Sequence, residues 1–168
     1  VVAAGADGKP DAGQDAAAPP MIKAGFADRE VVPDLGMEVP GGYGKAFGKK
    51  VNDPPKVRAA VFDDGKKRVA IVGVDALIIR RDTTIAARKL ITERTGIPAD
   101  CILLAASHSH TSGPTGMIAP GDFDHADEWV HELAYVKSSN ADPKYLERFI
   151  AGIADAVPPA DAAKVEAK

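Results

Sequence analysis

The stretch that decides the fold is VRAAVFDDGKKRVAIVGVDAL, residues 57–77. Two apolar segments in it flank the dipeptide Asp64-Gly65, a pattern typical of a tight turn between antiparallel strands. The second segment is apolar at nearly every position from Val69 to Val74, as in a central strand that is covered on both faces. The stretch therefore predicts a hairpin whose second strand lies inside a sheet.

A helix and another strand are expected after this hairpin. Asp82 is a candidate cap for the helix, and Gly96 with Pro98 is expected to end it. The residues CILLAAS, 101–107, then predict a second buried strand. A strand, a helix and a strand of these lengths form a βαβ unit with two parallel strands. The predicted fold class is α/β, a three-layer domain with a mixed, partly parallel sheet. The inward stripe of the helix is expected to contain Ala86, Ala87, Leu90 and Ile91.

The flanking segments add a strand, two long loops and a second helix. Residues 22–31 have short strand character, whereas residues 33–55 are thick with Gly and Pro and predict a long irregular segment, often a functional feature. A second long loop is expected over residues 108–140, and the tail from residue 158 is polar. Asp142-Pro143 predicts the start of a helix. Its apolar face is expected to contain Tyr145, Leu146, Phe149, Ile150, Ile153 and Val157.

Composition narrows the domain organisation and the function class. The chain has 168 residues, 45% of them hydrophobic, and a net charge of −3, which suits one globular domain and offers no basic surface for nucleic acid. No apolar run approaches the roughly 20 residues that span a bilayer.

Residues 1–20 predict a flexible leader or linker, and residues 21–168 predict the domain. We expect a secreted or periplasmic protein, because such a leader can remain after a signal peptide is cleaved. The lone Cys101 excludes an internal disulfide.

The candidate site follows the second buried strand, in LLAASHSHTSGPTG, residues 103–116. His108 and His110 come just after that strand, and Asp75 ends the strand before the crossover helix. Because ligands gather where parallel strands end, these side chains are expected at one rim of the sheet. Imidazole and carboxylate groups together suit zinc or a similar ion. Asp75 is expected to act as an acceptor that orients a ligating imidazole. The alternative is that the two histidines are ordinary loop residues and that Asp75 is a turn or helix-capping residue, none of them with a role in metal binding.

The other two histidines, His125 and His131, lie in the long loop, where solvated side chains are the default. One open alternative is a complete metalloenzyme in which His125 joins His108, His110 and Asp75. Another is a non-catalytic module that holds a small ligand or a partner without metal. No Gly-x-Ser-x-Gly elbow and no Gly-x-x-x-x-Gly-Lys-Ser/Thr phosphate loop is present, so a serine hydrolase or a nucleotide-binding enzyme is not indicated.

Three stretches together resemble the N-terminal domain of the neutral/alkaline, non-lysosomal ceramidases, and in particular bacterial ceramidase-like proteins. They are KAGFADREVVPDLGMEVPGGYG, the hairpin that opens this section, and LLAASHSHTSGPTG; the resemblance covers about residues 21–157. It implies a zinc hydrolase in which His108 is a metal ligand and His110 is catalytic. It also implies that Tyr43, Gly44, Ser112 and Gly113 contact a lipid-like substrate, an N-acyl sphingosine or a related amide or ester.

The sequence departs from that family in two ways. Thr111 stands between His110 and Ser112-Gly113, where the ceramidases run from histidine directly into Ser-Gly-Pro. The family's remaining metal ligands lie further along the polypeptide than residue 168. The resemblance therefore implies the N-terminal portion of a larger hydrolase, which needs the remainder of the parent domain, or a truncated inactive relative.

Overall fold

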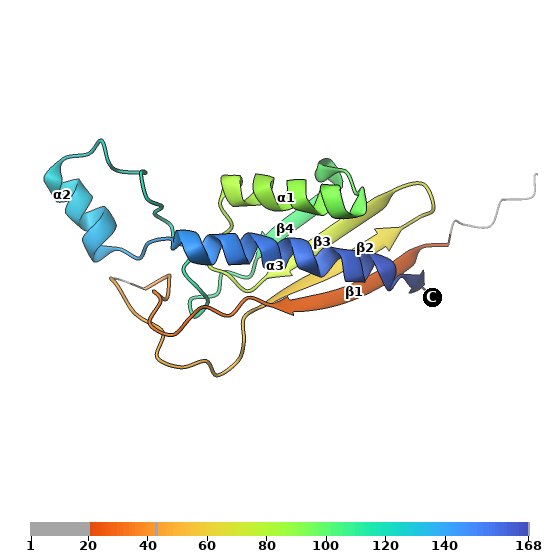
Figure 1. Ribbon diagram of the computed structural model, residues 1–168, viewed down its shortest axis with the longest axis horizontal. Helices are drawn as coiled ribbons and strands as arrows, with labels where there is room; N and C mark the ends of the chain where they lie inside the picture. The colour runs from red at the N-terminus through yellow and green to blue at the C-terminus, as the bar shows by residue number, and fades with distance from the viewer. Residues whose placement is uncertain (1–20, 43, 168) are drawn as a thin grey trace, which may run out of the picture.

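The computed structural model describes residues 21–42 and 44–167, so the predicted leader, residues 1–20, lies outside the described residues. Five strands form one mixed sheet in the order β4-β3-β2-β1-β5 (Figure 1). The hairpin is confirmed, since β2 and β3 pair antiparallel, and β3 and β4 are parallel neighbours on either side of α1. The elements are β1 (Lys23–Glu30), β2 (Lys56–Asp63), β3 (Arg68–Val74), α1 (Arg81–Thr95), β4 (Ile102–Ala106), α2 (Glu128–His131), α3 (Pro143–Ala162) and β5 (Val165–Glu166).

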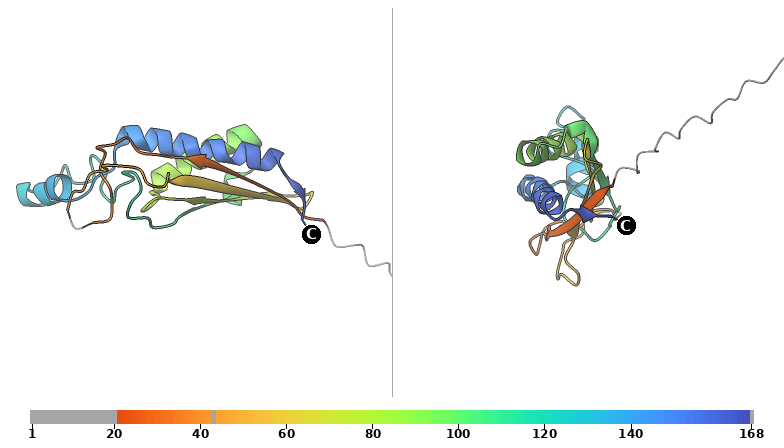
Figure 2. Two further views of the ribbon diagram at one scale, coloured as in Figure 1. Left: turned by 90° about the horizontal axis from the view of Figure 1, so that it is seen from below. Right: turned by 90° about the vertical axis from the view of Figure 1, so that its right-hand side faces the viewer.

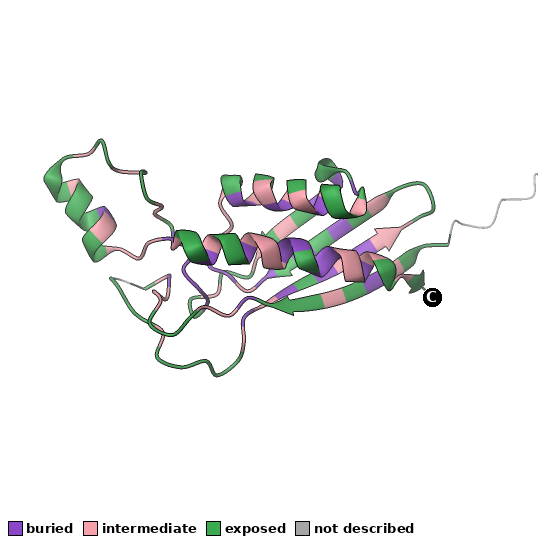
Figure 3. Cartoon of the chain, in the orientation of Figure 1, coloured by how far each residue is buried: buried purple, intermediate pink, exposed green. Residues whose placement is uncertain are grey.

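The long helices α1 and α3 lie on the same face of the sheet (Figure 2). Their apolar sides meet Val57, Val61 and Val72, which are all fully buried on that face. Along β3, buried residues alternate with exposed ones, and Figure 3 shows buried and exposed positions on the strands. Alternation places every second side chain on the opposite face. The α/β class, the mixed sheet and the βαβ unit are therefore confirmed, with two layers formed by the described residues.

The face without helices carries two neighbouring rows of mostly apolar side chains, formed by residues in register across the strands. One row is Phe26, Ala60, Ile71 and Leu103, and the other is Val165, Ala24, Phe62 and Val69. Phe26 is 67% exposed, Leu103 53% and Ile71 43%. The apolar character of β3 on both faces is real, but within the described residues no helix covers this second face, so the third predicted layer is not found there.

Two of the three helix-end residues that the sequence suggested have the predicted role. Asp142 caps α3, because its Oδ1 accepts from the Tyr145 backbone N–H at 3.0 Å. Gly96 ends α1 in the left-handed conformation, with φ 71°. Asp82 is the exception. Arg80 occupies the cap position, and Asp82 lies in the first turn, where its negative charge favours the helix N-terminus.

Two segments contain more regular structure than predicted. The loop after His108 includes α2, capped by Asp127, which accepts from the Val130 N–H, and a π-helical turn follows over Glu132–Lys137. The polar tail continues α3 through two prolines to Ala162 and then forms β5 against β1. Its helical residues are held by tertiary contacts, because Ala160 is fully buried and packs against Gly25 in β1. None of the described helices has the length and apolar character that a bilayer-spanning segment requires.

Candidate metal half-site at the ends of β3 and β4

Backbone hydrogen bonds continue beyond the ends of β3 and β4 and hold the segments that follow these two strands side by side at the candidate site. Ser107 N–H donates to the Val74 carbonyl at 2.9 Å, and Ser109 N–H donates to the Ala76 carbonyl at 3.0 Å. The chain around His108 therefore lies beside residues 75–77, which follow β3. The prediction that both strand ends reach one rim of the sheet is confirmed by this pairing.

His108 is held in an unusual conformation that fixes its ring. It is the one described non-glycine residue with a positive φ, at 60°, a value that L-residues rarely adopt. Its Nδ1 lies 3.0 Å from the Leu77 carbonyl oxygen. Because a carbonyl can only accept, Nδ1 donates in this hydrogen bond, and in a neutral ring Nε2 then presents a lone pair. This is the arrangement in which a histidine binds a metal through Nε2.

His110 lies directly against His108. The two ring centroids are 4.9 Å apart and the rings meet edge to face at 81°. Strand alternation through Ser109 does not produce this contact, since β4 ends at Ala106 and the backbone of His108 is in the left-handed conformation. The rings converge because the chain turns at His108, not because the strand continues.

Gly41 is a positioning residue that the sequence did not single out. A Cβ at this position would lie 2.7 Å from Nδ1 of His110 and 3.1 Å from Cδ1 of Leu77, closer than ordinary contacts allow. Its φ of 90° is also unfavourable for any other residue. Gly41 thus lets the long loop lie flat against His110, and the signal for it in the sequence was only the Gly-rich stretch itself.

Replacing Gly41 by alanine is expected to displace the His110 ring or the 41–44 loop. In a long-range imidazole ¹H–¹⁵N spectrum, the His110 ring signals should shift while the His108 signals, held by the Leu77 carbonyl, change less. Gly42→Ala is the matched control, because a Cβ there has only the Gly44 carbonyl at 3.9 Å. Unchanged His110 signals in Gly41→Ala would contradict the contact.

Asp75 does not orient either imidazole. Its Oδ2 accepts from the backbone N–H of Lys56 at 3.0 Å and from Nη1 of Arg58 at 3.0 Å. The reason is alternation: Val74 faces the helices, so Asp75 lies on the opposite face, beside Arg58. The acceptor role predicted for Asp75 belongs instead to the Leu77 carbonyl, a group that sequence reasoning has no means of singling out.

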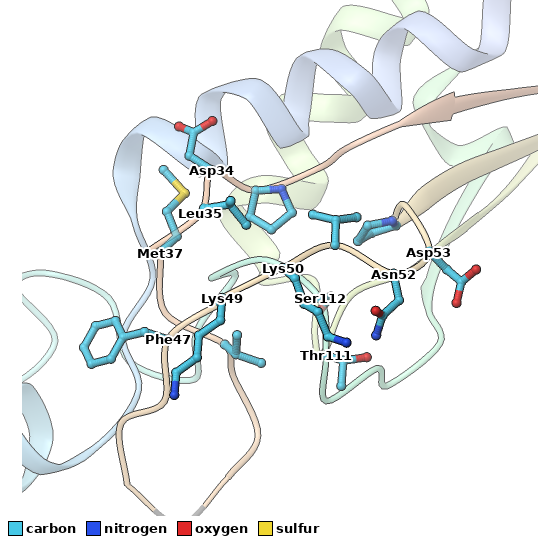
Figure 4. A pocket seen from close by; sticks show the side chains of 15 residues that line it. Asp34, Leu35, Met37, Phe47, Lys49, Lys50, Asn52, Asp53, Thr111 and Ser112 are labelled. Carbon is cyan, nitrogen blue, oxygen red and sulfur yellow. The ribbon is translucent and has the colours of Figure 1, made fainter.

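The residues expected to contact substrate lie in different surroundings. Ser112 is buried, donates to the Ser109 carbonyl at 3.2 Å and lines a cavity of about 420 Å³ together with residues 33–55 (Figure 4). Gly113 packs against the ring of Tyr145, and Gly44 lies near the Lys137 carbonyl, so neither reaches the histidine pair by the contacts the structure gives. Tyr43 lies outside the described residues. Substrate contact by these four residues stays a prediction.

The remaining histidines do not complete a metal site. Across residues 21–42 and 44–167 no three His, Cys, Asp or Glu side chains come together in a way that could hold a metal ion. The ring of His131 meets that of Tyr135 edge to face, with centroids 4.6 Å apart, and the Tyr135 hydroxyl donates to Asp124 at 2.8 Å. The alternative in which His125 closes a site with His108, His110 and Asp75 is therefore not supported by the described part of the chain.

The segment after the histidines is anchored by an ion pair. The two terminal guanidinium nitrogens of Arg80 donate to the Asp122 carboxylate, at 2.9 and 3.0 Å, and Ala119 N–H donates to it as well. The hydrogen bond from the Ala119 backbone is the main reason that the pKa of Asp122 lies below its usual value, and the hydrogen bonds from Arg80 are the second. Arg80 precedes α1, so the pair ties the loop that carries His110 to the crossover helix.

Comparisons with known proteins place the fold. No known family profile matches the sequence, and no curated protein matches it. Among solved structures, the crystal structure of neutral ceramidase from Pseudomonas aeruginosa superposes with a TM-score of 0.65 at 18% identity, and a ceramidase complexed with C2 superposes with 0.60, also at 18%. Each match covers 87% of this chain and 22% of the ceramidase chain. The domain therefore has a ceramidase-like fold and spans about a fifth of those proteins.

Proposed function

We propose that this domain contributes two imidazoles to the active site of a zinc-dependent amide hydrolase of the ceramidase kind. His108 is the proposed zinc ligand, through Nε2, and His110 is the proposed proton carrier. The observation that carries the proposal is the hydrogen bond from Nδ1 of His108 to the Leu77 carbonyl. It selects the tautomer a ligand needs and orients the ring before any metal arrives.

The residues present fit part of a zinc site. Zinc takes about four ligands, of which protein side chains supply three or four, and the described residues supply one proposed ligand, His108, with His110 beside it. The proposal therefore includes further ligands from polypeptide of the kind that makes up the rest of the solved ceramidases. The apolar rows around Ile71 and Leu103 support it, because an exposed apolar sheet face is typical of an interaction surface.

The proposed reaction is hydrolysis of an N-acyl sphingosine or a related amide or ester. Zinc bound at such a site lowers the pKa of water toward neutrality and polarises the substrate carbonyl. His110 faces Gly41 with Nδ1, which leaves Nε2 for proton transfer. That nitrogen can accept a proton as water oxygen bonds to the carbonyl carbon, and can return it to the departing amine nitrogen.

The test measures zinc binding by single-histidine variants, using titration calorimetry for the affinity and imidazole ¹⁵N chemical shifts for the ligand nitrogen. Zinc is expected to shift Nε2 of His108 most, and His108→Ala is expected to weaken binding at least about tenfold, since that variant lacks the proposed metal ligand. The chain provides a matched control in His125→Ala/His131→Ala, which removes the other two histidines and should leave the affinity unchanged.

Two outcomes would contradict the proposal. Equal losses of zinc affinity in the control pair and in His108→Ala would show nonspecific imidazole binding. Turnover of a fluorogenic N-acyl sphingosine by this chain alone, at a rate that His108→Ala abolishes, would show that the ligand set is complete without further polypeptide.

A further inference from the structure

The sheet ends at β4, a strand whose outer edge pairs with no other strand in the described part of the chain. β4 is the outermost strand in the order β4-β3-β2-β1-β5 (Figure 1). An edge strand has unpaired backbone N–H and C=O groups and can pair with another chain, unless charges, proline or shortness prevent it. The opposite edge is protected, because β5 has two residues and follows Lys164. Residues 101–107, CILLAAS, contain no charge and no proline, so the β4 edge lacks this protection.

The unpaired backbone groups of this edge belong to Ile102, Leu104 and Ala106. Ser107 N–H points inward, since it donates to the Val74 carbonyl at 2.9 Å. Along a strand, the N–H and C=O groups of successive residues point alternately to the two sides. Residues 103 and 105 therefore direct these groups toward β3, and residues 102, 104 and 106 direct theirs outward.

The edge is complementary to itself about Leu104. In an antiparallel pair of two such edges, Leu104 lies opposite Leu104 of the second copy, and Ile102 lies opposite Ala106. The outward residues then oppose one another, and each opposed pair forms two N–H···O bonds. Leu103 lies opposite Ala105 in a closely spaced pair, so a large side chain meets a small one. No two like charges face each other within this uncharged strand.

A hollow of about 220 Å³ at the start of β4 leaves room for the end of a second strand. Arg88, Asp100, Ile102 and Leu103 are among the residues that line it. Nε of Arg88 is buried and has no hydrogen-bond partner among the described residues. In the antiparallel pair, the segment that follows Ala106 of the second copy reaches this hollow. It brings backbone carbonyl acceptors to a guanidinium whose Nε its own chain leaves unpaired.

We propose that two copies of this chain pair antiparallel through β4 and form one sheet that is continuous across both copies. A second copy is the occupant because the edge matches itself in hydrogen bonding, in side-chain size and in lack of charge. The five residues of β4 span about 17 Å. That edge is narrower than a standard interface, which buries about 800 Å² per partner, so the dimer is expected to be weak.

This pairing involves neither the histidines nor the sheet face around Phe26. An added strand extends a sheet at its edge and does not cover its face. Because the two β4 strands run in opposite directions, the two histidine pairs lie at opposite ends of the junction. Zinc binding and dimerisation are therefore independent. A chain that dimerises without binding zinc would refute the proposed function alone, and a chain that binds zinc but stays monomeric would refute this inference alone.

Sedimentation velocity from low to high micromolar protein concentration measures the dissociation constant of the dimer. Leu103→Lys is expected to raise this constant at least about tenfold, because each dimer contains the Leu103–Ala105 pair twice. Leu103 is 53% exposed, so the variant is expected to fold. Ile71→Lys is the matched control, since Ile71 is 43% exposed in the same row but lies on β3, one strand inside the edge. It is expected to dimerise normally.

Amide hydrogen exchange tests the same pairing in the unaltered chain. Exchange at Leu104 N–H, which points outward, should slow as protein concentration rises, whereas exchange at Leu103 N–H, which points toward β3, should not depend on concentration. A chain that stays monomeric throughout, or a dimer that Leu103→Lys leaves intact, would overturn the inference. Equal losses in Leu103→Lys and Ile71→Lys would assign the contact to the sheet face and contradict pairing at the edge, as would unchanged exchange at Leu104.

Discussion

Replacing Phe149 by alanine is expected to lower the free energy of unfolding by about 3 to 5 kcal/mol, while Phe26→Ala is expected to lower it by less than about 1 kcal/mol. The two changes remove the same atoms. Phe149 is fully buried between α3 and the sheet and stacks on Tyr145 at 5.8 Å. Phe26 is 67% exposed on the face without helices, where its contact is an edge-to-face one with Phe62 at 6.3 Å.

The difference follows from what each side chain leaves behind. Removing Phe149 opens a cavity in a packed interior, so the lost transfer free energy and the lost packing add. Removing Phe26 leaves a surface that water already reaches. Urea unfolding of the two variants at one protein concentration measures the contrast. A loss at Phe26 as large as that at Phe149 would mean that the apolar rows are covered in solution, and a dependence on protein concentration would identify a second copy as the cover.

Gly113→Ala is expected to destabilise the domain by about 1 to 3 kcal/mol or more, because it overpacks a rigid interior. A Cβ at Gly113 would overlap the ring of Tyr145, which is 1% exposed and donates its hydroxyl to the Val31 carbonyl at 2.7 Å. Burial raises the pKa of that hydroxyl to about 12, so the hydrogen bond stays intact at neutral pH. The ring therefore has no room to move away.

The matched control is Gly73→Ala, on the open face of β3, where a Cβ meets nothing within 4 Å and φ is not positive. It is expected to leave stability unchanged or raise it slightly, since alanine restricts the unfolded chain. Thermal unfolding of the two variants decides the role of Gly113. Equal stabilities would contradict the packing role and return Gly113 to the substrate contacts that its sequence motif suggests.

The fold was largely predictable where the signals are local. Asp64-Gly65 indicated the hairpin, Gly96 ended α1 and Asp142-Pro143 started α3, each as the structure has it. The errors arose where distant contacts decide. The tail after residue 157 reads as a polar end, yet it stays helical because Ala160 packs on Gly25, which lies more than a hundred positions away in the chain.

The candidate site divides in the same way. The order of strands predicted that the residues after β3 and β4 share one rim, and His108 and His110 do lie there together. Asp75 was misassigned because the identity of a side chain does not show which partner it contacts. Arg58, on the neighbouring strand, was as plausible a partner as either histidine, and the structure shows the hydrogen bond to Arg58. Gly41 comes from a loop nearly seventy positions before His110, so only the folded chain shows their contact.

The sequence by itself determined the α/β class, the hairpin, the βαβ unit and the histidine pair at a strand end, because turn chemistry, alternation and helix ends depend on neighbours along the chain. Only the tertiary structure decided which face the helices cover, that the Leu77 carbonyl selects the tautomer of His108, and that Leu35, Phe47 and Val51 share a cavity with Lys49 and Lys50. These features depend on groups brought together through space. The partner of a backbone carbonyl and the covering of a sheet face are not specified by the identity of any single residue.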